Sequence, residues 1–295
     1  MPLRFACALI LVPVGLCAVE PDPFADALAL QGPVPRAAEA EPLAEVAGGQ
    51  FWFGKRVVVD TWSIVSSPFD WSGREWAIAG GAVVVTVASG LWLDREFQSE
   101  SQESRSPDKD RWSGTWGQLG TVYSFVVLGA AGTYGWLADD PRGVDVLVDG
   151  LEASVIASGI LSPLLKYAVG RSRPYQTAQD TDAIHPFSGA SSFPSGHTTQ
   201  AFTIASVVAC TYDDQPLVGG VAFVVATGVG LSRINNNAHY ASDVVAGAIL
   251  GTWVGYEVVR ANRARRGAPM GQAKGFTWDL LVASDRQGIT ATWRW

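Results

Sequence analysis

Six apolar segments follow one another along the chain, each bounded by charged residues, prolines or pairs of aspartates. Their length and their runs of Ala, Gly and Val are typical of helices rather than strands. A polar stretch at residues 95–111, REFQSESQESRSPDKDR, separates the first segment from the second and predicts a solvated loop. The pattern therefore predicts an all-α fold, a six-helix bundle. The segments are residues 76–93, 116–137, 144–168, 197–211, 216–231 and 240–259.

The two ends of the chain depart from this pattern. Residues 1–19 join one Arg to an apolar stretch and small residues, which predicts a secretory signal peptide, with a retained membrane anchor as the alternative. Residues 20–74 predict a partly disordered leader, because its first part is rich in Pro, Ala and Glu. Residues 75–262 predict the helical domain. In the tail, residues 263–295, apolar and polar positions alternate, which predicts a short C-terminal β-hairpin.

Length and composition bear on whether the helices cross a membrane. The chain is 48% hydrophobic and 17% charged, against about 25% charged in an average soluble domain. A membrane-spanning helix needs about 20 predominantly apolar residues. Segment 116–137 meets this length, 76–93 and 240–259 are near the limit, and 197–211 and 216–231 are short. We predict a membrane-embedded bundle, with a soluble helical bundle as the alternative.

Charge and cysteine content narrow the chemistry. The net charge of −7 argues against nucleic acid as the main partner, because phosphate backbones require clustered Lys and Arg. Any basic site must therefore be local. Cys210 is the one cysteine that follows the predicted signal peptide, which argues against a cysteine-based zinc site.

Three short motifs carry the candidate chemistry. The first closes the third segment, the second opens the fourth, and the third links the fifth segment to the sixth. Eleven positions in a fixed order are too many for coincidence, since each residue type occurs at about one position in twenty. Their residues are Lys166, Arg173 and Pro174 in the first, Pro194, Ser195, Gly196 and His197 in the second, and Ser232, Arg233, His239 and Asp243 in the third.

The cations of these motifs predict a phosphate site. Lys166, Arg173 and Arg233 lie at helix ends in an otherwise acidic protein. Arg binds phosphate oxygens with a planar fork and Lys acts as a point charge, so the three cations could neutralise a phosphoryl group from several sides. Ser195 and Gly196 lie where a helix begins, so free backbone N–H groups and the positive end of the helix dipole could hold an oxyanion there.

The histidines of the motifs predict covalent catalysis. His239 and Asp243 are four residues apart, which predicts one helical face and a carboxylate that orients the imidazole ring. This arrangement activates a nucleophilic nitrogen. His197 is then left to protonate the leaving oxygen. Each residue alone has a structural explanation, as a helix cap or a buried hydrogen-bonded group, and it is the joint spacing that favours catalysis.

These residues resemble the signature of the type 2 phosphatidic acid phosphatase superfamily, which also contains bacterial class A acid phosphatases and vanadium haloperoxidases. The resemblance extends over about residues 75–260. It implies that His239 is the nucleophile, Asp243 its partner and His197 the general acid. It also implies phosphatase chemistry without a metal ion or cofactor. The residues that it assigns to phosphate binding are Lys166, Arg173, Ser195, Gly196 and Arg233.

The sequence thus predicts a metal-independent phosphatase that forms a phosphohistidine and acts on a lipid-like phosphomonoester or an isoprenoid diphosphate. A soluble periplasmic acid phosphatase or phosphotransferase of broad specificity is the main alternative, and a vanadate-dependent haloperoxidase ranks third. The apolar helices favour the lipid substrate. No obligate protein partner is expected.

The predicted location is the bacterial cell envelope, either the inner membrane with the site facing the periplasm or the soluble periplasm. The arginines that follow the sixth segment predict a cytoplasmic C-terminus. With six spans, this orientation conflicts with a cleaved signal peptide, and both readings stay open. The third histidine, His185, lies outside the motifs and is predicted to be a loop residue.

Overall fold

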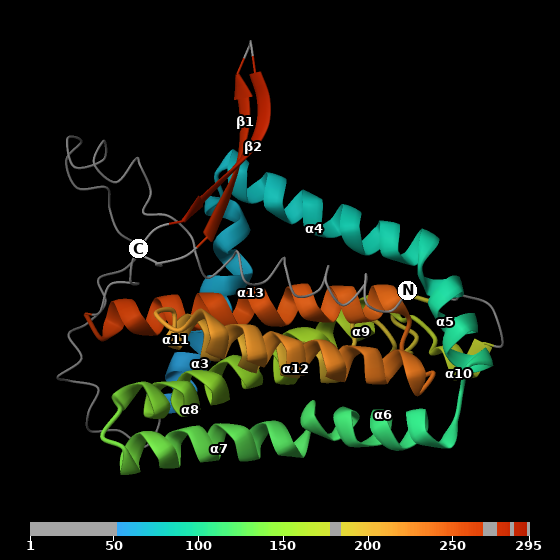
Figure 1. Cartoon of the computed structure of the whole chain (residues 1–295), viewed down its shortest axis with the longest axis horizontal. Helices are drawn as coiled ribbons and strands as arrows, with labels where there is room; N and C mark the ends of the chain where they lie inside the picture. The colour runs from blue at the N-terminus through green and yellow to red at the C-terminus, as the bar shows by residue number, and fades with distance from the viewer. Residues whose placement is uncertain (1–51, 178–183, 268–275, 284–285, 294–295) are drawn as a thin grey trace.

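The computed structural model describes residues 52–177, 184–267, 276–283 and 286–293. Most of its helices lie side by side along the long axis of the molecule (Figure 1), which confirms the predicted helical class. The predicted signal peptide and the first part of the leader lie outside the described residues. The helices are α3 (Trp52–Ser66), η2 (Ser67–Asp70), α4 (Gly73–Trp92), α5 (Asp94–Glu103), α6 (Pro107–Leu119), α7 (Val122–Leu137), α8 (Pro141–Ser154), η3 (Val155–Leu161), α9 (Ser162–Val169), α10 (Pro174–Thr177), α11 (Gly196–Thr211), α12 (Pro216–Asn235) and α13 (Ala241–Arg265).

The count of six helices is therefore wrong within this part of the chain, and the largest error concerns residues 95–111. They form α5 and the start of α6 instead of a solvated loop. Ser106 caps α6 by accepting a hydrogen bond from the Lys109 amide at 3.3 Å, and Pro107 occupies the first helical position. The Ser113 hydroxyl contacts Asn236, next to α12, at 2.6 Å. Polar contacts and a few apolar side chains, such as Phe97 of α5 and Leu119 of α6, hold these helices against the bundle, so their sequences lack a continuous apolar stripe.

The end of the predicted leader is also part of the fold. Residues 52–66 form α3, which buries Val57 and Ile64 against the core. On the same helix, Asp60 accepts a hydrogen bond from Arg265 at 2.7 Å. The prediction of a leader is therefore wrong for this helix, because its contacts come from residues far away in the sequence.

Two of the predicted segments have a different internal structure. Segment 116–137 breaks between α6 and α7, where Gly120 lies against α11: a Cβ atom there would be 2.8 Å from the carbonyl oxygen of His197. Segment 144–168 is continuous from α8 to α9 through η3, a π-helical stretch. Such stretches are rare and frequently lie at functional sites.

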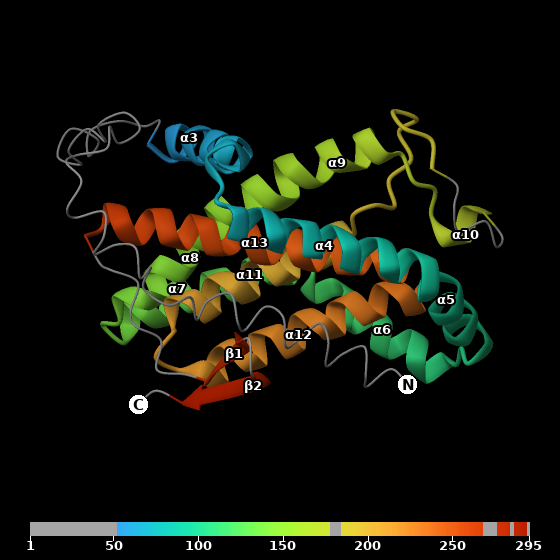
Figure 2. The same cartoon turned by 90° about the horizontal axis from the view of Figure 1, so that it is seen from above.

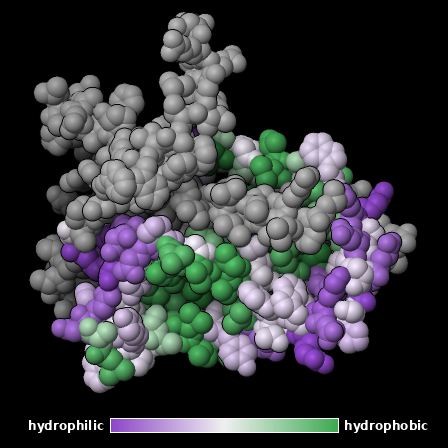
Figure 3. Space-filling model, in the orientation of Figure 1, coloured by the Kyte–Doolittle hydropathy of each residue, from purple (hydrophilic) through white to green (hydrophobic). Residues whose placement is uncertain are grey.

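Three described helices are long and apolar enough to cross a membrane, namely α4, α12 and α13. At 16 residues, α7 is shorter than a span, whereas α12 is longer than the segment predicted for it. Figure 3 shows hydrophobic side chains near the middle of one face and hydrophilic ones toward both ends of the long axis. This distribution fits a bundle with an apolar belt.

Helices α11 and α13 form the centre of the bundle and approach each other unusually closely. Gly247, Gly251 and Gly255 recur every fourth residue on the face of α13 that meets α11. A Cβ atom at Gly247 would lie 2.7 Å from the carbonyl oxygen of Ser195. Larger residues at these positions would push the helices apart, so the glycines fix the distance between the second motif and the third.

The apolar core surrounds this helix pair. Phe202 of α11 packs against Phe223 of α12, with ring centroids 5.9 Å apart, and both rings are fully buried. Val244 and Ala248 of α13 belong to the same cluster. The side chains that fix the ends of α11, α12 and α13 are therefore anchored in one rigid core.

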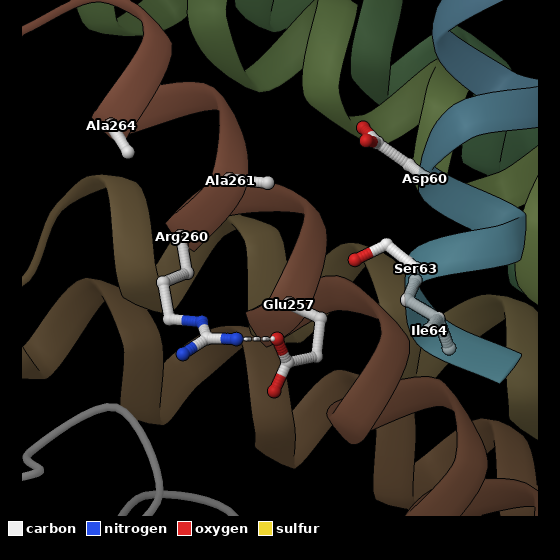
Figure 4. Close-up of a pocket in the computed structure, with 7 residues that line it drawn as sticks. All are labelled: Asp60, Ser63, Ile64, Glu257, Arg260, Ala261 and Ala264. Atoms are coloured by element: carbon white, nitrogen blue, oxygen red, sulfur yellow. Dashed lines mark hydrogen bonds and ion pairs between the residues drawn. The ribbon is translucent and has the colours of Figure 1, made fainter. Parts of the chain in front are cut away.

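After α13, residues 276–283 and 286–293 are drawn as strands β1 (Phe276–Ala283) and β2 (Arg286–Trp293), paired antiparallel. The helical fold class describes residues 52–177 and 184–267 and does not include these strands. The C-terminal hairpin stays a prediction. A pocket of about 220 Å³ lies between α3 and the C-terminal part of α13 (Figure 4). Its lining, which includes Asp60 and Arg260, contains none of the motif residues.

Candidate active site

All three motifs lie at one end of the bundle. The C-terminal ends of α9 and α12 meet the N-terminal ends of α11 and α13 there, on the right in Figures 1 and 2. Gly170 ends α9 in the left-handed conformation, with φ of +60°, and a Cβ atom there would overlap the backbone of His185. This turn leads the chain directly from Lys166 to Arg173, so the first motif depends on a glycine between its cations.

His239 and Asp243 are neighbours, but not for the predicted reason. Helix α13 begins at Ala241, so His239 precedes it and does not share its face. The carboxylate of Asp243 instead reaches back, accepting a hydrogen bond from the Tyr240 amide at 3.0 Å. His239 Nδ1 lies 3.6 Å from Asp243 Oδ2, just beyond hydrogen-bonding distance. The other ring nitrogen, Nε2, therefore points away from Asp243.

Asp243 has further partners that the motif analysis missed. The Arg171 guanidinium donates to its Oδ1 at 2.8 Å, and the Ser192 hydroxyl donates to its Oδ2 at 2.5 Å. Arg171 also donates to Asp94, at the start of α5, at 2.7 Å. Arg171 lies inside the first motif, two residues before Arg173, and its charge at this position is the one sequence signal that could have found it. Asp94 gives no such signal, because it is remote in sequence.

Lys166 joins the first motif to the second. Its Nζ donates to the carbonyl oxygens of Ser191 and Pro194, at 2.7 and 2.5 Å. Its Cε lies 3.8 Å from the point where a Cβ of Gly196 would be. Arg173 reaches the same loop, with 3.4 Å between its Nη2 and the hydroxyl of Ser191. Both cations therefore lie beside the N-terminus of α11.

The oxyanion cradle at this N-terminus is smaller than predicted. The Ser195 amide is not free, because it donates to the carbonyl oxygen of Asp243 at 3.0 Å. The Ser195 hydroxyl accepts a hydrogen bond from Thr198 and makes no cap bond to the helix. The first amides of an α-helix have no acceptor within the helix. The cradle therefore begins at Gly196, and Ser195 contributes by tying α11 to Asp243.

His197 is surrounded by positive charge. Burial lowers its pKa to about 3, and the neighbouring Arg233, Arg173 and Lys166 act in the same direction. The third motif brings Arg233 and His239 together, because the His239 amide donates to the carbonyl oxygen of Arg233 at 3.3 Å. His197 is therefore a neutral imidazole at neutral pH.

Burial also shifts the pKa values of two further groups at the site. Burial lowers the pKa of His239 to about 4, although the carboxylate of Asp243 opposes this shift. Burial and the charge of Arg173 lower the pKa of Lys166 to about 8. At neutral pH, His239 therefore keeps a nitrogen lone pair while Lys166 keeps most of its positive charge.

Several buried polar atoms at this end have no hydrogen-bond partner within the described residues. They include Arg233 Nε, His239 Nδ1 and the hydroxyl of Ser162, one turn before Lys166 on α9. A buried donor without a partner costs about 1–3 kcal/mol. Similar atoms lie elsewhere in the bundle, for example the hydroxyl of Thr252, so by themselves they do not mark a ligand site.

Other ligands find little support in the described part of the chain. It contains no cluster of three or more His, Cys, Asp or Glu side chains arranged to hold a metal ion. His185 is exposed, and its amide donates to the carbonyl oxygen of Gly170 at 2.9 Å. This agrees with a loop residue outside the site.

Comparison with known proteins identifies the family from this region. Residues 150–266, which contain all three motifs, match the PAP2 superfamily. This part of the chain belongs to the PAP2 superfamily. The match begins within α8, so it is shorter than the resemblance over residues 75–260, and it leaves α4 to α7 outside.

Two relatives of the PAP2 segment are phosphatases by name. A lipid A 1-phosphatase of Porphyromonas gingivalis is 42% identical over 91 residues, 30% of this chain and 18% of that protein. An undecaprenyl-diphosphatase of Sulfolobus acidocaldarius is 28% identical over 106 residues, 36% of this chain and 50% of that protein. The chain thus spans half the length of these relatives or less.

A solved structure resembles the fold more loosely. The crystal structure of Aquifex aeolicus LpxE aligns with a TM-score of 0.45 and 24% identity, covering 57% of this chain and 95% of that chain. At this level the likeness concerns the fold alone, and the chemistry has to be argued from the residues of this chain.

Proposed function

We propose that this protein is a metal-independent phosphatase that removes phosphate from a lipid phosphomonoester or an isoprenoid diphosphate through a phosphohistidine on His239. The observation that carries the proposal is the concentration of cations around two neutral histidines, of which His197 is half-buried and His239 is buried. Such a site is complementary to a phosphoryl group, whose charge in the transition state is spread over three oxygens.

In the first step, Nε2 of His239 attacks phosphorus, an N–P bond forms and the P–O bond to the leaving group breaks. His197 donates its proton to the leaving oxygen. In the second step, His197 takes a proton from water, whose oxygen attacks phosphorus and breaks the N–P bond. Free phosphate and neutral His239 result. Asp243 stabilises the positive ring of the phosphohistidine.

The low pKa of His197 gives the substrate a part in this cycle. His197 can donate a proton only if its pKa rises when substrate binds. A bound phosphate brings negative charge next to Arg233, Arg173 and Lys166, the groups that lower this pKa. Binding of a charged phosphate thus raises the pKa of His197 and prepares it to act as the acid, whereas an uncharged ester would leave this pKa low.

Two observations support a lipid substrate. Within the described residues, three helices are apolar and long enough to cross a membrane, and α12 and α13 bring Arg233 and His239 to the ends of such spans. The relatives are phosphatases of membrane lipids by name. Binding energy from a lipid tail remote from the phosphate can raise turnover as well as affinity.

The same geometry supports an orientation in the inner membrane. The histidines lie at the N-terminal end of α13, and Arg260, Arg263 and Arg265 lie at its other end. Since positive residues favour the cytoplasmic side, the site would face the periplasm.

The test of the substrate is a panel assayed in mixed micelles with purified enzyme. We expect phosphatidic acid, phosphatidylglycerol phosphate, lipid A or an isoprenoid diphosphate to exceed glycerol phosphate at least a hundredfold in kcat/KM, about 2.7 kcal/mol. EDTA should leave the rate unchanged. Equal values for short and long substrates would favour the soluble acid phosphatase, and a loss in EDTA that zinc or magnesium restores would reveal a metal site.

The test of the mechanism is rapid quench with a labelled phosphate ester. His239→Ala should abolish both turnover and the acid-labile phosphohistidine. His185→Ala is the matched control, because this histidine lies in an exposed loop, and it should retain both. Substantial turnover by the His239→Ala protein would remove His239 from the mechanism.

A further inference from the structure

Behind the candidate nucleophile, two carboxylates share one arginine. Nη1 of Arg171 donates to Asp243 at 2.8 Å, and its Nη2 donates to Asp94 at 2.7 Å. Both carboxylates are fully buried, and 8% of the Arg171 side chain is exposed. The guanidinium also lies over the ring of Tyr240, 4.1 Å from its centroid.

Asp94 holds the start of α13 in a second way. It accepts hydrogen bonds from the backbone amide and the hydroxyl of Ser242, both at 2.7 Å. Arg171 Nη1 contacts the same hydroxyl at 2.7 Å. The residue that precedes Asp243 and the carboxylate of Asp243 itself are therefore fixed by the same pair.

This arrangement is costly to bury, so a purely structural role would be more simply met by apolar side chains. Burial raises the pKa of Asp94, and the charge of Arg171 opposes this shift. The Asp94–Arg171–Asp243 chain ends at His239, 3.6 Å from Asp243. Its charges lie where they act on the histidine.

We propose that Arg171 and Asp94 are positioning residues: they hold the Asp243 carboxylate against His239 and, through their charges, set the pH below which His239 stops acting as a nucleophile. This inference rests on the proposed function. Arg171 withdraws negative charge from Asp243 and so favours neutral His239, while Asp94 partly cancels Arg171 and so has the opposite effect. The other charged or titratable groups facing His239 and Asp243 are Lys166, Arg173, His197, Arg233 and Tyr240.

The test is the pH profile of kcat/KM, whose acid limb reports the protonation of His239 in the free enzyme. Arg171→Met should move the midpoint of this limb up by about one pH unit, because Asp243 then stabilises the imidazolium more strongly. Asp94→Asn should move it down, because the charge of Arg171 is no longer shared. One substrate is used throughout, so its own ionisation is constant.

Two further variants separate the effect of charge from an effect on folding. Arg171→Lys keeps the charge and should keep the wild-type midpoint, even if its rate falls. The double variant Arg171→Met with Asp94→Asn removes one charge of each sign and should return the midpoint toward wild type. If Arg171→Met does not fold, the midpoint of Asp94→Asn decides: a downward shift supports the inference, and no shift or an upward shift overturns it.

Unmoved midpoints in Arg171→Met and Asp94→Asn, with a phosphohistidine still formed, would overturn this inference and leave the proposed function standing. Shifts of the same sign in both variants would also overturn it. If the wild-type enzyme forms no phosphohistidine, the proposed function fails first. Opposite shifts are the result that a merely structural role does not produce.

Discussion

Two buried clusters of charge lie at opposite ends of α13, and they differ in balance. At the N-terminal end, four cations face two carboxylates, Asp94 and Asp243, within the described residues. The cations are Lys166, Arg171, Arg173 and Arg233. This candidate active-site cluster has an excess of positive charge.

At the C-terminal end, three arginines meet the buried carboxylates of α3 and α8. Arg266 donates to Asp149 at 2.7 Å, and the amide of Asn262 donates to the same carboxylate at 2.9 Å. Arg56 pairs with Glu152, and Arg265 pairs with Asp60. The three arginines face three buried carboxylates, so the buried part of this second cluster is balanced, and it joins α3 to the bundle. The partly exposed Asp145 also contacts Arg266, at 3.1 Å.

The difference shows what each cluster does. A balanced buried cluster needs no ligand. Removal of one of its partners lowers the stability of the protein, because a buried charge is left unpaired. An unbalanced cluster holds like charges together, which weakens the free protein but prepares a site for an anion. Charge balance thus distinguishes the network that joins α3 to the bundle from the proposed active site, although both are built from Arg and Asp.

Among the changes that compare the two clusters, Arg233→Met should have the largest effect. It should lower kcat/KM about a thousandfold, since loss of one donor to transition-state charge costs 10²–10³ and Arg233 also carries a full charge. Binding of orthovanadate, a mimic of the transition state, should weaken in parallel. Thermal stability of the free enzyme should not fall, because the cluster loses surplus positive charge. A large fall in stability with unchanged kcat/KM would reverse the roles of the two clusters.

The next effect should appear in Arg266→Met, at the balanced cluster. It leaves the buried Asp149 without its main cation and should lower the free energy of unfolding by about 3 kcal/mol. Thermal melting in detergent measures this, and kcat/KM should stay within about twofold. The matched control is Arg260→Met, because Arg260 is exposed and paired with Glu257 on the surface. Such a pair contributes about 0–1 kcal/mol, so both the melting temperature and kcat/KM should stay near wild type.

The smallest effect concerns pH. Lys166 binds phosphate only when protonated, so activity should fall as pH rises through its lowered pKa of about 8. Lys166→Arg keeps its charge at every accessible pH. It should therefore remove this alkaline limb from the pH profile of kcat/KM, at some loss of rate. Lys109→Arg, an exposed lysine on α6, is the control. An alkaline limb that stays in place would assign it to another group.

Comparison of the expected and observed helices shows where sequence reasoning works. The segments at α4, α11, α12 and α13 are predicted within a few residues, because long apolar stretches with clear boundaries determine a helix locally. The polar helix α5, the first turns of α6 and helix α3 are missed, since their stability comes from contacts such as Asp60 with Arg265. Such contacts have no local pattern.

The candidate site divides in the same way. The spacing of the motifs names the histidines and the cations, and the structure brings these residues together. The spacing does not reveal that His239 lies before the helix or that the Ser195 amide donates a hydrogen bond to Asp243. It also does not reveal that Arg171 contacts Asp243 and Asp94. The roles of all these residues remain predictions.

The sequence by itself determined the helical class, the local positive charge in an acidic chain and the order of three motifs along it. Those properties depend on residue type and on neighbours within a few turns. Only the tertiary structure decided which charges share a partner. Asp94 meets Ser242 across 148 positions of sequence, and Gly247, Gly251 and Gly255 set how close α11 comes to α13. Burial and distance fix the proton affinities at the site, and both arise only when the helices pack.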